Sequence, residues 1–270
     1  MTASDKLSKK NSEGKLSCVG LDTDINKIPS SLKNSSDAVF NFNKRMIEKT
    51  FKSAAAYKLN FAFYEKYGAA GFDILKRTIE IIPDDILIIG DAKRGDIGNT
   101  SKMYADSIYN FFKCDASTLN PYMGEDSIKP FLEFQQKLNF ILALTSNPSA
   151  LNFEKKKLVN GNYLYQEVMD KVKEWNNFRN CGLVFGATNI EELNENISRM
   201  EDLPVLLPGV GVQGGSLLDV VNTFKKARRL NLLINVSRGI IYKSSEDNFA
   251  EAAAEELNTL NTKIKKEMNI

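Results

Sequence analysis

The sequence predicts an α/β fold with a single domain, a (β/α)8 TIM barrel. Eight short apolar runs, each the length of a strand, recur along the 270 residues, with amphipathic segments between them. Several runs are continuously apolar, which is typical of a parallel sheet that helices cover on its outer face. No stretch reads as a linker, so we expect one domain over residues 1–270. An open doubly wound sheet is the alternative.

The predicted strands are, in chain order, LSCVGL (16–21), AAAYKLNFAF (54–63), ILIIG (86–90), CDASTLN (114–120), FILAL (140–144), GLVFGA (182–187), PVLLPGV (204–210) and LLINV (232–236).

Amphipathic periodicity predicts helices between these strands. Residues 71–82 place four apolar side chains on one helical face: Phe72, Leu75, Ile79 and Ile82. Residues 216–229 do the same with Leu217, Val220, Val221 and Phe224. Residues 246–268 are rich in strong helix formers and predict a closing helix. Two segments fall outside this pattern. The polar residues 1–13 are a candidate flexible N-terminal extension, and residues 147–163 are a long insertion in the loop after the fifth strand.

The composition excludes several classes of function. The chain has no histidine, which rules out Ser-His-Asp triads and most zinc sites. Its formal net charge of +2 argues against a nucleic-acid surface. Three widely spaced cysteines, without a CxxC pair, suit reduced thiols that serve as small packing residues. The N-terminus lacks a signal peptide, and no apolar run approaches the ~20 residues of a membrane helix. We therefore expect a cytoplasmic protein that binds neither membranes nor nucleic acids.

Charged residues gather where the predicted strands end, which is where a barrel holds its chemistry. The stretch GDAKRGDIGNTS (90–101) follows an apolar strand and carries Asp91, Lys93 and Asp96. Lys58 lies inside the second strand, where an unpaired buried ion would be destabilising, so we expect Asp91 and Asp22 as its partners. Asp91 and Lys93 are two residues apart and would point the same way on a regular strand. A salt-bridge network that only braces the mouth of the barrel is the alternative.

The segment GVGVQGG (209–215) formally matches the dinucleotide-binding pattern G-x-G-x-x-G. That pattern belongs in the first βα unit, with an acidic residue about 20 positions later. Here the segment follows the seventh strand, and no acid lies at that distance. Loops after strands seven and eight of a barrel often bind phosphate at a helix start. We therefore expect a phosphate site here, with contacts from Arg238 and Gln213, and tight turns alone as the alternative.

Several of these segments resemble one enzyme family. DAKRGDIGNTS resembles the signature D-x-K-x-x-D-I-x-x-T of orotidine 5′-monophosphate decarboxylases, and LPGVGVQGG resembles their phosphate-loop segment. VGLD in the first strand, YKLN in the second and Arg238 after the eighth match the family in order and spacing. The segments VGLD and TSNPS, and the insertion, are similar to the bacterial subgroup with longer chains. The resemblance covers roughly residues 14–245.

The resemblance implies an activity and an assembly. The activity is decarboxylation of orotidine 5′-monophosphate to uridine 5′-monophosphate (UMP) in pyrimidine biosynthesis, without a metal or another cofactor. The assembly is a homodimer with active sites at the subunit interface.

The resemblance also implies a role for each site residue. Lys58, Asp91, Lys93 and Asp96 would form the catalytic charged tetrad, with Lys93 as the proton donor. Asp96, Ile97 and Thr100 would come from the partner subunit. Asp22 and Asn60 would hold the ribose, and Thr145 and Ser146 would contact the pyrimidine. The pyrimidine and phosphate ends would be lined by Pro208, Gln213, Gly215 and Arg238.

Two other functions remain open. Mg²⁺-dependent sugar-phosphate decarboxylases and hexulose-phosphate synthases share D-x-K-x-x-D, although the continuation from Ile97 to Thr100 favours orotidylate. A non-catalytic nucleotide-binding barrel is the third possibility, and the intact Asp91 and Lys93 argue against it.

Overall fold

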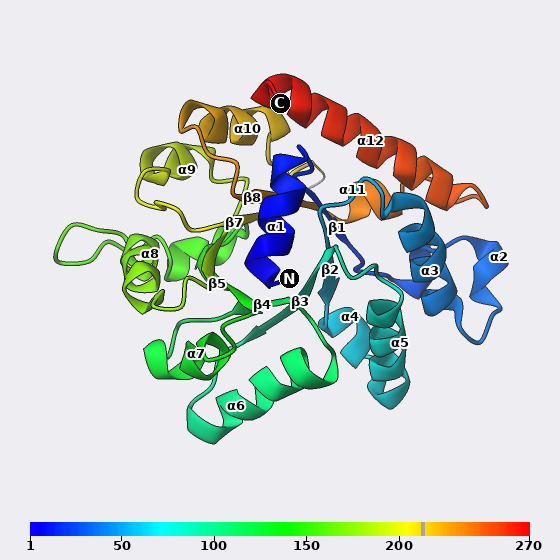
Figure 1. Ribbon diagram of the computed structural model, residues 1–270, viewed down its shortest axis with the longest axis horizontal. Coiled ribbons are helices and arrows are strands. Elements are labelled where there is room, and N and C mark those ends of the chain that lie inside the picture. Colours follow the sequence, from blue (N-terminus) through cyan, green and yellow to red (C-terminus); the bar gives the residue numbers. More distant parts are fainter. Residues whose placement is uncertain (212–213) are drawn as a thin grey trace.

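The computed structural model describes residues 1–211 and 214–270. Its parallel strands close into a barrel in chain order, with β8 pairing to β1 (Figure 1). The strands are β1 (Ser17–Gly20), β2 (Ala56–Asn60), β3 (Leu87–Arg94), β4 (Ala116–Leu119), β5 (Leu138–Leu144), β6 (Cys181–Phe185), β7 (Val205–Pro208) and β8 (Leu232–Val236). Each strand overlaps one of the predicted apolar runs. The predicted barrel is therefore confirmed, and the open sheet is excluded.

Helices form a ring around the strands (Figure 1). The longer ones are α3 (Ala38–Thr50), α5 (Gly68–Glu80), α6 (Gly98–Asp106), α7 (Glu125–Leu132), α8 (Leu164–Trp175), α9 (Ile190–Asn196), α10 (Leu217–Lys226) and α12 (Phe249–Met268). Short helices are α2 (Ser30–Lys33), α4 (Ala62–Glu65) and α11 (Arg238–Ile241). Single turns of 3-10 helix lie at Ile25–Lys27 and Pro148–Asn152, and a π-helical turn lies at Ser107–Phe111.

The N-terminal residues form helix α1 (Ala3–Ser12), which lies across one end of the barrel (Figure 1). Ala3 and Leu7 are buried against interior side chains of the strands. The ammonium of Lys6 lies 2.8 Å from the carboxylate of Asp115, just before β4. The expectation of a flexible extension over residues 1–13 is therefore not met. The sequence signal was weak because few side chains of this short polar helix are apolar. Packed in this way, α1 closes the N-terminal end of the barrel and leaves the other end open.

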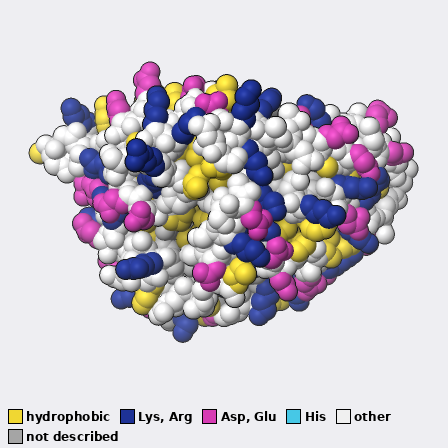
Figure 2. Space-filling view, turned by 45° about the horizontal axis from the view of Figure 1, so that its top comes forward, with side chains coloured by type: hydrophobic (Ala, Val, Ile, Leu, Met, Phe, Trp, Pro, Cys, Tyr) yellow, Lys and Arg dark blue, Asp and Glu magenta, His cyan; other side chains and the backbone are white. Residues whose placement is uncertain are grey.

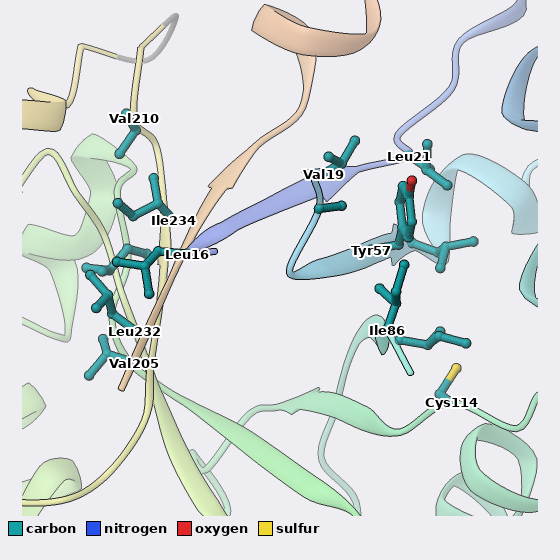
Figure 3. Packing of buried hydrophobic residues seen from close by; sticks show 14 of the residues in the cluster. Leu16, Val19, Leu21, Tyr57, Ile86, Cys114, Val205, Val210, Leu232 and Ile234 are labelled. Atoms are coloured by element: carbon teal, nitrogen blue, oxygen red, sulfur yellow. The ribbon is translucent and has the colours of Figure 1, made fainter. Parts of the chain in front are cut away.

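Apolar side chains pack on both faces of the barrel wall. On the outer face, Figure 3 shows Leu232 of β8 next to Val205 of β7. On the inner face, Cys18, Ile89 and Phe140 belong to the cluster that α1 covers. Because the side chains on both faces of the strands are buried, the strands appear in the sequence as continuous apolar runs. All three cysteines are buried and unpaired, as expected for packing residues.

Most residues of the predicted helix faces are buried, but Leu217 is only partly buried and Phe72 is exposed. Leu75, Ile79 and Ile82 are buried, but Phe72 is 37% exposed. Phe72 lies against Phe112 at the outer edge of α5, with the two ring centroids 5.7 Å apart. The helical periodicity therefore identified the correct buried face of α5 but wrongly included Phe72 in it.

The surface mixes charges of both signs. Figure 2 shows Lys and Arg interspersed with Asp and Glu across the visible face. Within the described part of the chain, no helix has both the length and the apolar character needed to cross a bilayer.

Candidate active site

A cavity of about 700 Å³ opens at the C-terminal ends of the strands, opposite α1. Its lining combines residues from all eight strands or the loops that directly follow them. Nine predicted site residues line it: Asp22, Lys58, Asn60, Asp91, Lys93, Thr145, Ser146, Pro208 and Arg238. The volume is that of a site for a small molecule rather than for a macromolecule.

Lys58 is buried at the floor of this cavity and makes the predicted ion pairs. Its side chain is 5% exposed, and its ammonium donates to Asp91 Oδ2 at 2.7 Å. The Oδ1 atom of Asp22 lies 3.6 Å from the same ammonium. Strand pairing explains the convergence, because Lys58 lies beside Gly20 on β1 and Ile89 on β3. A buried lysine with two carboxylates keeps its charge.

Asp91 receives hydrogen bonds from three groups. Lys58 occupies Oδ2, while Lys93 Nζ donates to Oδ1 at 2.7 Å and Thr118 Oγ1 donates to the same atom at 2.8 Å. The hydroxyl of Thr118 also accepts the backbone N–H of Lys93 at 3.0 Å. Asp91 thus fixes both ammonium groups, and Thr118 fixes Asp91 and the backbone of Lys93.

Lys93 reaches Asp91 by a route that differs from the predicted one. The register between β3 and β4 shifts between Gly90 and Arg94, so β3 is not a regular strand at this point. Lys93 has a φ of 49°, in the left-handed region that residues with a Cβ rarely adopt. Such a conformation is destabilising by about 1–3 kcal/mol and tends to occur where function requires it. The irregular backbone, and not the alternation of a strand, turns the ammonium toward Asp91.

The charges around Lys58 shift its protonation and that of Asp91. Burial would raise the pKa of Asp91, but the neighbouring Lys58 and Lys93 outweigh it and hold this pKa well below its usual value. Burial would lower the pKa of Lys58, but Asp22 and Asp91 outweigh it and raise this pKa above its usual value. Both groups are therefore charged at neutral pH. The formal charges of the cavity lining balance, since four acids (Asp22, Asp24, Asp91, Glu154) face four bases (Lys27, Lys58, Lys93, Arg238).

A second set of polar groups surrounds Asp22. Its Oδ2 accepts a hydrogen bond from Ser237 Oγ at 2.7 Å. Gly20 makes room for this contact, because a Cβ on Gly20 would lie 1.9 Å from Ser237 Oγ. Oδ1 of Asp22 and Oδ1 of Asn235 are buried without a hydrogen-bond partner in the described part of the chain. Buried acceptors of this kind are normally satisfied, so a hydroxyl-bearing ligand suits this part of the cavity.

The glycine segment after β7 forms a tight turn. Gly209 has a φ of 99° and Gly214 a φ of 94°, values that favour glycine. The N–H of Gly215 donates to Gly209 O at 3.0 Å, and the N–H of Gly211 donates to Gly215 O at 3.0 Å. These N–H groups bond within the turn, so they would bind an anion only after the turn opens. Arg238 lies across the same cavity, exposed at the start of α11.

Several predicted site residues do not line the cavity. Asp96, Ile97 and Thr100 follow β3 outside it, and the side chain of Ile97 is 57% exposed. Gly215 packs against Ala187 beneath the turn instead of lining the cavity. Gln213 lies outside the described residues.

Eight polar residues that line the cavity were not among the predicted site residues: Asp24, Lys27, Thr118, Asn147, Glu154, Asn235, Ser237 and Tyr242. Thr118 lies in the fourth predicted strand, and Asn235 and Ser237 lie at the end of the eighth. Their position at strand ends was a usable signal. Glu154 comes from the insertion, and nothing in the sequence marks it. In the residues that the structure describes, no group of three or more Cys, Asp or Glu side chains is arranged to hold a metal ion.

Comparisons with known proteins identify the family of this chain. The profile of the orotidine 5′-phosphate decarboxylase / HUMPS family matches residues 17–254. A protein of Christiangramia forsetii named orotidine 5′-phosphate decarboxylase is 45% identical over 254 residues, which are 93% of each chain. A Porphyromonas gingivalis protein of the same name is 46% identical over 242 residues, 88% of this chain and 87% of that one.

Solved structures give the same result. The OMP decarboxylase of Leishmania donovani is 34% identical with a TM-score of 0.80, over 97% of this chain and 99% of that one. The UMP synthase of the same organism is 35% identical with a TM-score of 0.84, but this chain covers only 57% of its length. With its profile matched over most of its length, the chain belongs to the orotidine 5′-phosphate decarboxylase / HUMPS family.

Proposed function

We propose that this protein decarboxylates orotidine 5′-monophosphate to UMP, the step that completes the pyrimidine nucleotide. The observation that carries the proposal is the hydrogen-bonded array Lys58–Asp91–Lys93 inside the cavity, with 2.7 Å between Asp91 and each ammonium. The family profile and relatives with this name over most of the chain support the same reaction.

The array suits the chemistry of this reaction. Breaking the bond between C6 and the carboxylate leaves an electron pair on C6, and the pyrimidine ring offers no ready sink for it. A fixed ammonium beside C6 stabilises that negative charge as it develops. Carbon dioxide leaves as that bond breaks, and the proton that Lys93 Nζ donates then forms the new C6–H bond with the electron pair. This assignment gives Lys93 both tasks, and Asp91 orients it for both.

Asp91 has a second task in the proposed mechanism. It faces the carboxylate that leaves, so the two negative charges repel each other in the bound substrate and separate as the bond breaks. Lys58, held by Asp91 and Asp22, keeps Asp91 ionised and in place. The ammonium of Lys93 therefore stabilises the negative charge that develops on C6 in the transition state, while Asp91 destabilises the carboxylate of the bound substrate.

The rest of the cavity suits the other parts of the nucleotide. Asp22 and Asn60 would bind the ribose, which agrees with the buried Oδ1 of Asp22, since this atom has no hydrogen-bond partner among the described residues. Thr145 and Ser146 would meet the pyrimidine, with Pro208 along its edge. Arg238 would bind the phosphate, together with Gln213 and the turn that Gly215 closes. Phosphate binding there would open the turn between Gly209 and Gly215 and draw it over the ligand.

We also propose a homodimer in which Asp96, Ile97 and Thr100 complete the site of the partner subunit. The location of these residues outside the cavity of their own chain supports it, as does the apolar surface near them. Exposed apolar side chains there include Ile97 (57%), Met103 (58%), Tyr122 (77%) and Met123 (47%). Exposed apolar side chains, where they gather into a patch, mark protein–protein interfaces.

A spectrophotometric assay of orotidylate loss tests the proposed reaction. Orotidylate should be consumed and UMP formed at the same rate with and without EDTA. Activity that EDTA abolishes would favour a Mg²⁺-dependent sugar-phosphate enzyme. Tight UMP binding without any turnover would favour a nucleotide-binding protein without catalytic activity.

A further inference from the structure

The insertion between β5 and α8 sends one acid, Glu154, back into the cavity. Its Oε2 accepts the backbone N–H of Thr145 at 2.6 Å. The hydroxyl of Thr145 lies 2.8 Å from Oε1 of the same carboxylate. The side chain of Glu154 therefore accepts from both hydrogen-bond donors of Thr145, which lies at the end of β5 and nine positions earlier in the chain.

Other contacts hold the same turn from the β6 side. Asn189 Nδ2 donates to the carbonyl of Thr145 at 3.0 Å. Gly186 lies directly beneath the next residue, because a Cβ there would be 2.7 Å from the backbone nitrogen of Ser146. The peptide groups on both sides of Thr145 are therefore fixed, one by Glu154 and the other by Asn189.

This arrangement leaves the polar groups of Ser146 available. Within the described residues, neither its backbone N–H nor its hydroxyl has a hydrogen-bond partner, and Ser146 lines the cavity. A donor N–H beside a hydroxyl that can donate or accept suits the amide-like edge of a pyrimidine ring. The orientation of these two groups depends on the peptide that Glu154 holds.

A carboxylate beside a cavity for an anionic nucleotide repels that ligand, so the negative charge of Glu154 does not favour binding. The contacts of Glu154 depend instead on the length and hydrogen-bonding atoms of its side chain. The Thr145 hydroxyl has a single proton for three nearby acceptors, which are both Glu154 oxygens and Asn147 Oδ1 at 2.6 Å. A glutamine at position 154 would still reach both groups, accepting the N–H of Thr145 through its oxygen and donating to the hydroxyl through its nitrogen. A shorter side chain would not reach them.

We propose that Glu154 is a positioning residue that fixes the Thr145–Ser146 turn for recognition of the nucleobase, and that this is one role of the insertion. The inference rests on the proposed function. Glu154 acts through the turn and does not itself contact the reacting atoms. Fixing the turn does not require the negative charge of Glu154. It requires a side chain of this length with an oxygen that accepts the backbone N–H of Thr145.

Calorimetric titration of the full chain with UMP and with ribose 5-phosphate tests the inference without an activity assay. Glu154→Ala should weaken UMP binding about tenfold and leave ribose 5-phosphate within about twofold, since only UMP carries the base. Glu154→Asp should behave like Ala, and Glu154→Gln should stay within about threefold of wild type. Glu192→Gln is the matched control, because it removes the acid that pairs with the neighbouring Lys155 and does not touch Thr145.

Each result decides the question. Equal losses for both ligands, or unchanged UMP binding in Glu154→Ala, would overturn the inference while leaving the proposed function intact. A Gln variant as weak as Ala would also overturn it, because charge rather than geometry would then matter. If Glu154→Ala does not fold, Glu154→Asp carries the same test. A wild type that binds UMP no better than ribose 5-phosphate would overturn the proposed function, and the inference with it.

Discussion

Replacing Lys93 with alanine should abolish turnover while leaving the fold almost as stable as before. The side chain of Lys93 is 49% exposed, and pairs of this exposure contribute about 0–1 kcal/mol to folding. Asp91 would keep its bonds to Lys58 at 2.7 Å and to Thr118 at 2.8 Å. The unfolding free energy of Lys93→Ala should therefore fall by no more than about 1 kcal/mol.

Lys58 provides the contrast. Its side chain is 5% exposed, and breaking a buried pair leaves an uncompensated charge at a cost of about 3–5 kcal/mol. Lys58→Ala should therefore lose several times more stability than Lys93→Ala.

The expected loss of rate follows from the two tasks assigned to Lys93. Positioned proton transfer contributes about 10²–10⁴-fold, and a fixed charge at the developing anion about 10²–10³-fold. Together they predict a fall in kcat of at least about 10⁴-fold. Urea denaturation measures stability, and orotidylate absorbance measures rate. Lys171→Ala on the exposed side of α8 is the control and should change neither. A Lys93→Ala variant that keeps more than about 1% of wild-type kcat would refute the assigned role.

Three further predictions follow from the same geometry. Lys93→Gly should be more stable than Lys93→Ala by roughly 1 kcal/mol in urea denaturation, because only glycine accepts the left-handed φ freely; equal stabilities would contradict the strain. Arg238→Ala should raise KM for orotidylate at least about tenfold and leave binding of the nucleoside orotidine unchanged, whereas equal losses for both would exclude a phosphate contact. The third concerns pH. Because the pKa of Asp91 is lowered in the folded state, its ionised carboxylate stabilises the fold at pH values above the usual pKa of 3.8. Because the pKa of Lys58 is raised, its ammonium stabilises the fold at pH values below the usual pKa of 10.5. The stability difference between wild type and Asp91→Asn should therefore stay constant from about pH 5 to about pH 9, and a drop inside that window would show that one of the pair titrates there.

The fold was predictable because its signals are local. Strands buried on both faces must be apolar throughout, and each of the eight runs became a strand. The partners of Lys58 were predictable for a physical reason as well, since a lysine inside such a run requires carboxylates nearby. Helix α1 was not predictable, because ion pairs such as Lys6 with Asp115 hold it in place and leave no periodic pattern in the sequence.

The site was predictable in its charges and less so in its geometry. The alternation of side chains along a strand correctly predicted that Lys93 and Asp91 lie together. It assumed a regular strand, however, and the backbone of β3 is irregular at Lys93. Glu154 could not be predicted, because its role depends on how the insertion folds back onto Thr145. Contacts that an irregular loop makes with a neighbouring strand end follow no fixed residue spacing, so the sequence does not reveal them.

Hydrogen exchange at C6 of UMP tests the central claim most directly. If Lys93 delivers the proton to a C6 carbanion, the reverse step must also occur, and the wild-type enzyme should exchange the C6 hydrogen of bound UMP in D₂O. NMR of the nucleotide would record the exchange, and Lys93→Ala should abolish it. Exchange that persists undiminished in Lys93→Ala, or a wild type that decarboxylates orotidylate without any exchange, would contradict the account.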